Sequence, residues 1–192
     1  PNFEDVSREA NLFRKAYPKD QEIGGIGNTG AGVAWADYDN DGDLDLYWKC
    51  AEYDIDNALF RNNGDGTFTD VTEESGTAIL EMVTEGNSQG SPNWTDVNQD
   101  GLIDLLVTNE GDRKIMLLNQ GDGTFENITP SFRAPSATAF LNPGNANGAC
   151  VGDIDNDGDM DVFLPTADQS NRLYISQLSE TGELSYKDIS LT

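Results

Sequence analysis

A nine-residue pattern occurs three times along the chain, at nearly even spacing. It reads D-Y-D-N-D-G-D-L-D at 37–45, D-V-N-Q-D-G-L-I-D at 96–104 and D-I-D-N-D-G-D-M-D at 153–161. Successive copies start 59 and then 57 residues apart. A regular period of this length indicates that each copy lies inside one unit of a repeating structure.

Each copy holds a complete set of hard oxygen ligands around a glycine. Alternate side chains of a tight loop converge, which brings positions one, three and five together, and the glycine at position six permits a sharp turn. The carbonyl at position seven and the Asp at position nine complete a set of the kind that calcium takes. The sequence therefore predicts three calcium sites, with these ligands: Asp37, Asp39, Asp41, Asp43 (carbonyl) and Asp45; Asp96, Asn98, Asp100, Leu102 (carbonyl) and Asp104; Asp153, Asp155, Asp157, Asp159 (carbonyl) and Asp161.

Other interpretations of the loops are weaker. An EF-hand needs a Glu at position twelve and flanking helices, whereas position twelve here is Trp48, Val107 or Leu164. Asp, Asn and Gly also favour turns without any metal, but three copies that all keep the final Asp favour calcium. Magnesium is rarely bound by all-protein cages, and a chain with no His and two Cys offers few ligands to transition metals.

The residues on both sides of the loops are typical of strands. Short apolar runs follow the loops at 44–48, 103–107 and 160–164, and small residues precede two of them, at 32–34 and 148–151. Each loop is therefore expected to join two neighbouring strands.

A second pattern follows each loop. It reads L-F-R-N-N-G-D-G-T-F-T-D-V-T at 59–72 and L-L-N-Q-G-D-G-T-F-E-N-I-T at 117–129, with a degenerate copy at 173–190. An Asp-Gly turn between apolar arms predicts a hairpin, so 65–66 and 122–123 are interpreted as turns and not as metal ligands. With the two strands around the loop, each repeat holds four short strands, which suggests propeller blades whose small first strands crowd near the axis. No segment has a clear helical period.

These motifs resemble the FG-GAP/VCBS-type repeats of integrin alpha subunits, fungal propeller lectins and bacterial surface proteins. The loop followed by N-x-G-D-G-T-F-x-[DN]-[VI]-T is most similar to the cartilage-acidic-protein-like branch, and the resemblance covers nearly the whole chain. It implies an all-β fold of four-stranded antiparallel propeller blades, with calcium between the first two strands of each. The integrin Phe-Gly and Gly-Ala-Pro elements are absent, so integrin-like partner binding is not implied.

The repeats divide one propeller region, 1–192, into unequal parts. Residues 1–10 match the last strand of a preceding blade, and three blades follow at 28–75, 88–132 and 145–192. Propellers typically close with four to eight blades. We therefore expect this region to belong to a larger propeller or to close with other copies of itself. The chain begins at Pro1 without Met, as a processed or excised form does.

The composition restricts the kinds of binding partner and the cellular location that the chain can have. The net charge is −24, with 11 basic and 35 acidic residues, so no basic patch is available for nucleic acid or anionic lipid. No apolar run is long enough to insert across a membrane. Weak calcium loops act best where calcium is millimolar, which favours an extracellular, cell-surface or periplasmic location.

Catalysis has little support in the sequence. His, the commonest general base, is absent, and the Asp54/Asp56 pair fits an exposed loop. We expect no enzyme, but a calcium-stabilised module that binds a protein or glycan, as in adhesion. The alternatives are a carbohydrate-binding lectin or the propeller part, catalytic or not, of a polysaccharide-active enzyme.

Four aromatic residues and two cysteines leave alternatives open. Sugar could stack on Trp35, Trp48, Trp94 or Tyr53, although strand positions favour core packing for the three Trp. Cys50 and Cys150 are either two buried free thiols, the favoured interpretation, or a disulfide between non-adjacent repeats.

Overall fold

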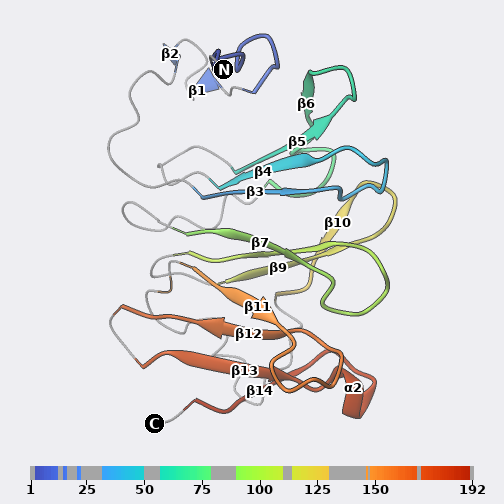
Figure 1. Ribbon diagram of the computed structural model, residues 1–192, viewed down its shortest axis with the longest axis vertical. Coiled ribbons are helices and arrows are strands. Elements are labelled where there is room, and N and C mark those ends of the chain that lie inside the picture. The colour runs from blue at the N-terminus through green and yellow to red at the C-terminus, as the bar shows by residue number, and fades with distance from the viewer. Residues whose placement is uncertain are drawn as a thin grey trace.

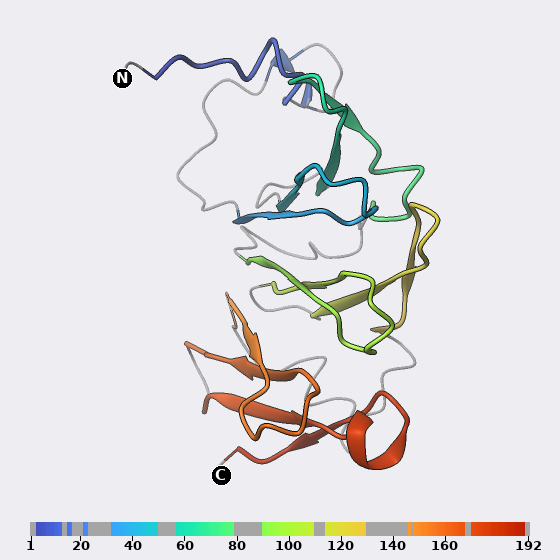
Figure 2. The same ribbon diagram turned by 45° about the vertical axis from the view of Figure 1, so that its right-hand side comes forward.

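Three four-stranded antiparallel sheets follow one another along the long axis of the molecule (Figures 1 and 2). The computed structural model describes residues 3–12, 15–16, 21–22, 32–49, 57–78, 90–109, 114–129, 146, 148–167 and 170–190. Their other regular elements are a two-stranded hairpin, β1 (Lys15–Ala16) with β2 (Gln21–Glu22), and one short helix, α2 (Leu178–Thr181). The predicted all-β class with propeller-like blades is confirmed, and the described residues form no closed ring.

Each sheet keeps its strands in chain order, as the four-strand repeat predicts. Blade 1 contains β3 (Gly32–Ala36), β4 (Asp45–Lys49), β5 (Ala58–Asn62) and β6 (Phe68–Asp70). Blade 2 contains β7 (Pro92–Thr95), β8 (Asp104–Val107), β9 (Ile115–Asn119) and β10 (Phe125–Asn127). Blade 3 contains β11 (Cys150–Gly152), β12 (Asp161–Leu164), β13 (Arg172–Ser176) and β14 (Tyr186–Asp188). The sheets lie within the expected ranges 28–75, 88–132 and 145–192, whose exact ends stay predictions.

The hydrophobic core lies between neighbouring sheets. Successive side chains of a strand point to opposite faces, so β8 sends Leu105 and Val107 toward blade 1 and Leu106 toward blade 3. Tyr47 and Leu59 of blade 1 complete the first cluster. Each blade is thus stabilised by burial on its neighbours, which explains why β8 is apolar without alternation.

The first strands of blades 1 and 2 approach closely, and glycine makes this possible. Between the two blades, a Cβ atom on Gly32 would lie 2.5 Å from the carbonyl oxygen of Gly90. Within blade 2, a Cβ atom on Gly90 would lie 2.1 Å from the carbonyl oxygen of Thr108. These distances are far below van der Waals contact. They give the physical reason for the small residues at the start of the first strand.

Some sequence expectations need correction. Core packing is wrong for Trp35, which is 50% exposed on β3, whereas Trp94 packs against the first cluster and Trp48 is half-buried. Cys150 is a free thiol, but it is exposed and not buried as expected. Cys50, Tyr53 and the Asp54/Asp56 pair lie outside the described residues.

The N-terminal segment repeats the turn that follows a blade's last strand. In Ser7–Asn11 the N–H of Ala10 donates to the carbonyl of Val6 at 2.9 Å, as Ser75 N–H does to Val71. Phe68 N–H then donates to the Ala10 carbonyl at 2.9 Å, and Phe125 N–H donates to that of Ser75 at 2.8 Å. No strand is assigned within 3–12, so the assignment of 1–10 to a preceding blade stays a prediction.

Candidate metal centre

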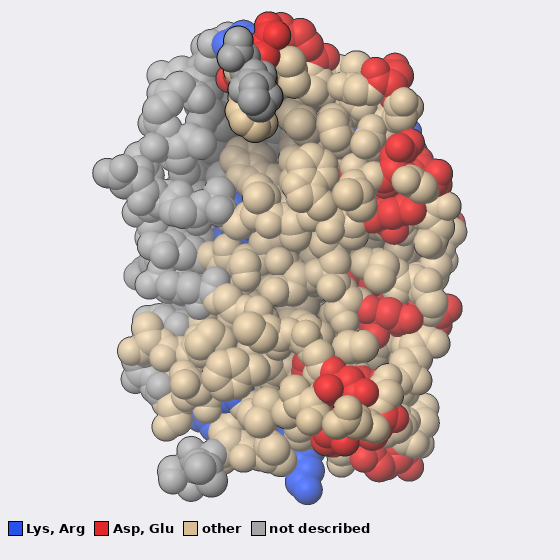
Figure 3. Space-filling view, viewed as in Figure 1, with Lys and Arg blue, Asp and Glu red and all other residues tan. Residues whose placement is uncertain are grey.

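The three repeated loops lie along one side of the molecule, each between the first and second strands of its blade. They form the right-hand side of the ribbon in Figure 1, and acidic side chains gather along the same side in Figure 3. The loops hold 13 of the 35 acidic residues. Negative charge is thus concentrated at one end of all three blades.

All three loops share one backbone conformation. Position six is a glycine with φ of 86–100°, and position four is a non-glycine residue with φ of 59–65°; the latter residues are Asn40, Gln99 and Asn156. Asn tolerates the left-handed region better than most residues, and the glycine adopts it without strain. The pattern D-x-[DN]-x-D-G therefore encodes the turn as well as the ligand types.

Carboxylates at positions one and five hold the loop in this shape. In loop 1 (37–45), the two oxygens of Asp37 accept hydrogen bonds from the N–H groups of Asp41 and Gly42, each at 3.0 Å. Asp41 Oδ1 accepts from the N–H of Asp43 at 2.9 Å. The corresponding bonds in loops 2 (96–104) and 3 (153–161) span 2.8–3.2 Å.

The final Asp of each loop is a buried link between strands. Asp104 is fully buried, and its oxygens accept hydrogen bonds from the N–H groups of Val97 at 3.0 Å and Asn119 at 2.8 Å. Asp45 bonds in the same way to Tyr38 and Asn62, and Asp161 to Ile154 and Ser176. This residue therefore ties its loop to the third strand, in addition to any contact with an ion.

Burial makes two of these carboxylates costly to ionise. Desolvation raises the pKa of Asp45 and of Asp104 to about 6, against the hydrogen bonds that lower it. A dication beside them would favour the charged form. In loop 1, Asp39 Oδ1 is also shielded from solvent without a hydrogen-bond partner. Both observations fit a cation in these loops.

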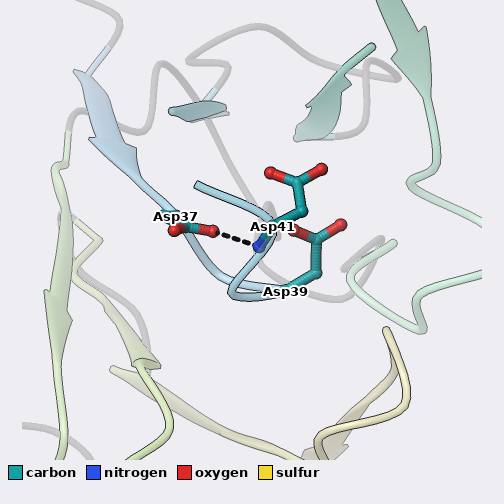
Figure 4. A group of neighbouring side chains, drawn as sticks. All are labelled: Asp37, Asp39 and Asp41. Carbon is teal, nitrogen blue, oxygen red and sulfur yellow. Dashed lines mark hydrogen bonds between the residues drawn. The ribbon is translucent and has the colours of Figure 1, made fainter. Parts of the chain in front are cut away.

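Loop 1 brings together its carboxylates at positions one, three and five, whereas loop 3 brings together those at positions one, three and nine. Oxygens of Asp37, Asp39 and Asp41 lie within 4.8 Å of one another (Figure 4). Asp153, Asp155 and Asp161 form a similar group in loop 3. In both loops some predicted side-chain ligands stand apart from the group: Asp45 in loop 1, and Asp157, which instead groups with Asp159 and Glu180.

Loop 2 uses an amide where loop 1 uses a carboxylate. The Asn98 side chain donates to Asp100 Oδ2 at 2.8 Å, and Asn98 Oδ1 accepts from the Asp100 N–H at 3.2 Å. Among the described residues, this loop gathers no group of three carboxylates. The carbonyl ligands assigned to Asp43, Leu102 and Asp159, and the ligand sets as a whole, remain predictions.

Two side chains that are not predicted ligands connect the sites of neighbouring blades. The Asn119 amide donates to the carbonyls of Tyr38 at 2.7 Å and Ile103 at 3.1 Å, which links loop 1 to loop 2. Gln99 Nε2 donates to the Gly158 carbonyl at 2.8 Å and links loops 2 and 3. Sequence reasoning missed these contacts, although the Asn that ends the third strand is shared by the first two repeats.

The Asp-Gly pairs of the hairpins are turns, as predicted. Asp65 Oδ1 accepts from the N–H and hydroxyl of Thr67 at 2.9 and 2.6 Å, and Asp122 does the same with Thr124. These hydrogen bonds lower the pKa of both carboxyls. Their oxygens serve the turn and lie outside the acidic groups of the loops.

Comparisons with known proteins agree with this repeat structure. The model of the FG-GAP-like repeat matches residues 96–164. Cartilage acidic protein 1 of Xenopus tropicalis is 28% identical over 70% of the chain, and the mouse and human proteins are each 24% identical over 93%. The aligned region spans only 19–25% of the length of these relatives. The described residues contain no helix of the length and apolarity needed to cross a membrane. Residues 96–164 thus match the FG-GAP-like repeat, and the chain as a whole is similar in sequence to cartilage acidic protein 1.

Proposed function

We propose that the chain is a calcium-stabilised binding module in which each of the three loops holds one calcium ion. The observation that carries the proposal is the fully buried Asp at position nine of loops 1 and 2, whose raised pKa a bound dication would offset. The ions act as structural links, because they neutralise acidic loops that would otherwise repel one another. No catalytic role is part of this proposal.

Ion counting tests the proposal directly. Equilibrium dialysis against calcium, followed by elemental analysis, is expected to give one bound ion fewer in each of Asp37→Ala, Asp96→Ala and Asp153→Ala. Position one is the target because its side chain contacts the loop alone, which leaves the sheet intact. Asp65→Ala, in a hairpin turn, is the matched control and keeps every ion. Unchanged ion content in all three loop variants would refute the proposal.

Calcium affinity is expected to fall at acidic pH. The folded-state pKa of Asp45 and Asp104, about 6, lies above the ordinary value of 3.8. Without metal, their contribution to stability is therefore full below pH 3.8 and lost as the pH rises through about 6. Calcium needs the deprotonated form, so affinity at these sites falls about tenfold from pH 7 to pH 5. Calorimetric titration at both values checks this, and equal affinities would contradict it.

We place the module outside the cytoplasm, on a cell surface, in a periplasm or secreted, with a protein or a glycan as its ligand. The support is the millimolar calcium of such compartments, which suits loops of this kind, and the similarity to cartilage acidic protein 1. Half-exposed Trp35 is the aromatic surface that a lectin would use. Its position favours another contact, with a further blade.

Further blades fit both ends of the row. In blade 2, the Trp94 ring contacts Tyr38 and Tyr47 of blade 1, with centroids 6.5 and 6.1 Å apart. Trp35 holds the same position in blade 1 and contacts Phe68 of its own blade, yet it is 50% exposed. At the opposite end, Ile154 is 55% exposed where Val97 of blade 2 is fully buried.

We propose that these two faces pack against other copies or other segments of a longer chain that close the propeller. Sedimentation equilibrium separates the two cases. Association between copies gives a mass that rises with concentration and that Trp35→Glu reduces. Closure by other segments leaves this region monomeric at every concentration.

A further inference from the structure

Blade 3 differs from the other two blades in the hairpin beside its loop. Nine residues, 177–185, separate its third and fourth strands, whereas five do so in blades 1 and 2. The added residues form α2, which carries Ser179 and Glu180. The structure thus places two oxygen-bearing side chains where the other blades have a short Asp-Gly turn.

The residue at position seven of each loop faces the hairpin of its own blade. In blade 1, a Cβ atom on Gly64 would lie 2.8 Å from Asp43 Oδ2, and in blade 2 one on Gly121 would lie 3.2 Å from Leu102 Cδ1. In blade 3 the position is Asp159, whose Oδ2 accepts a hydrogen bond from the Ser179 N–H at 2.9 Å. The hairpin residue that faces this carboxylate is a glycine in blade 1, whereas in blade 3 it is Ser179, which Glu180 follows.

Asp159 is fully buried and incompletely satisfied. Its Oδ1 is shielded from solvent and has no hydrogen-bond partner, and desolvation raises the pKa of this carboxyl. A buried carboxylate oxygen without a partner is costly unless a proton or a cation compensates it. Asp43, the equivalent residue of blade 1, is exposed and has no such need.

Two further carboxylates complete the group. Oxygens of Asp157, Asp159 and Glu180 lie within 4.8 Å of one another. The Ser179 hydroxyl donates to Asp157 Oδ2 at 2.7 Å and so turns this carboxylate toward α2. The separate group of Asp153, Asp155 and Asp161 shares no residue with this one. Oxygens on opposite sides of a calcium ion are about 5 Å apart, twice the usual bond length, so the spacing fits one ion.

We propose that Asp157, Asp159 and Glu180 form a second calcium site in blade 3, beside the ion of loop 3. The site goes beyond the proposed function, which gives each loop a single ion. Water molecules would complete its coordination, since three carboxylates supply too few ligands for calcium. Blade 3 then has two cations where blades 1 and 2 have one each.

Equilibrium dialysis against calcium, with elemental analysis of the protein, tests the second site. Glu180→Gln is expected to bind one ion fewer than the wild type. Glu183→Gln is the matched control, because Glu183 is an exposed residue just beyond α2 and outside the group; it keeps all ions. Asp159→Leu introduces the residue of blade 2 and is expected to lose the same ion. It should also unfold at a higher temperature than the wild type in chelator, because it removes the unpartnered buried oxygen.

The outcomes separate this site from the proposed loop sites. Equal ion content in the wild type and Glu180→Gln overturns the second site, and the loop sites still stand if Asp37→Ala loses an ion. Loss of an ion in Glu180→Gln, with none lost in Asp37→Ala, supports the second site and overturns the site in loop 1. A wild-type chain that binds no calcium overturns both.

Discussion

Calcium is expected to raise the unfolding temperature of this chain by about 20 °C over the same protein in chelator. An ion at 100 times its dissociation constant stabilises the folded state by about 2.7 kcal/mol, so three independent loops give about 8 kcal/mol. In a domain of this size, each kcal/mol raises the unfolding temperature by about 2–4 °C. Circular dichroism at 218 nm, an ordinary wavelength for β-structure, follows the transition.

Two controls make this result specific. Magnesium at the same concentration screens the −24 net charge equally well but fits the loops poorly, so it should produce only a small part of the shift. A variant with Asp37→Ala, Asp96→Ala and Asp153→Ala together should unfold at one temperature with calcium or chelator. If the wild type also unfolds at one temperature in both conditions, the loops are metal-free turns and the structural role of calcium is wrong.

The sequence predicted the blades because each local signal agreed with the others. The glycine at position six of the loop and the Asp-Gly turn mark where the chain reverses direction. The apolar runs mark the second strand of each blade, as in Asp104–Val107. Prediction of the second strand was accurate to one residue, because the loop ends on the Asp that starts it. Because the three repeats share the same two motifs, each repeat was expected to hold the same four strands.

The sequence could not predict how the loops are connected in space. The Asn119 contact with Tyr38 depends on how two sheets stack, and the pattern within one repeat carries no such information. Trp35 and Trp94 occupy the same position of their repeats. Among the described residues, only the Trp94 ring faces a neighbouring blade. Burial of this Trp therefore depends on whether another blade lies beside it. Strand position alone does not carry that information, so the prediction of core packing was wrong for Trp35.

The group around Glu180 was missed for a different reason. By its pattern the third hairpin is a degenerate copy of the first two, and similarity alone assigns no role to its additional residues. Their number, four more than in the other blades, was the available signal. An insertion beside a ligand-rich loop supplies new side chains to that loop, and α2 does so with Ser179 and Glu180.

Asp104→Ala is expected to destabilise the chain by about 3 kcal/mol even in chelator, since a buried donor left without its partner costs about 1–3 kcal/mol. Asp104 is fully buried in the middle blade and accepts the N–H groups of Val97 and Asn119. Both donors would lose their partner in the variant. Relief of the desolvated charge, shown by the pKa of about 6, offsets part of this cost.

Asp100→Ala is the matched control, because it removes a predicted ligand of the same ion from an exposed position. Water can replace its hydrogen bonds to Leu102 and Asn98, so its stability in chelator should stay within about 0.5 kcal/mol of the wild type. With calcium, both variants lose the stabilisation that the ion of loop 2 provides. Urea unfolding of the three proteins, with and without calcium, separates the two roles. Equal stabilities of Asp104→Ala and Asp100→Ala in chelator would mean that Asp104 acts only as a ligand and not as a link between strands.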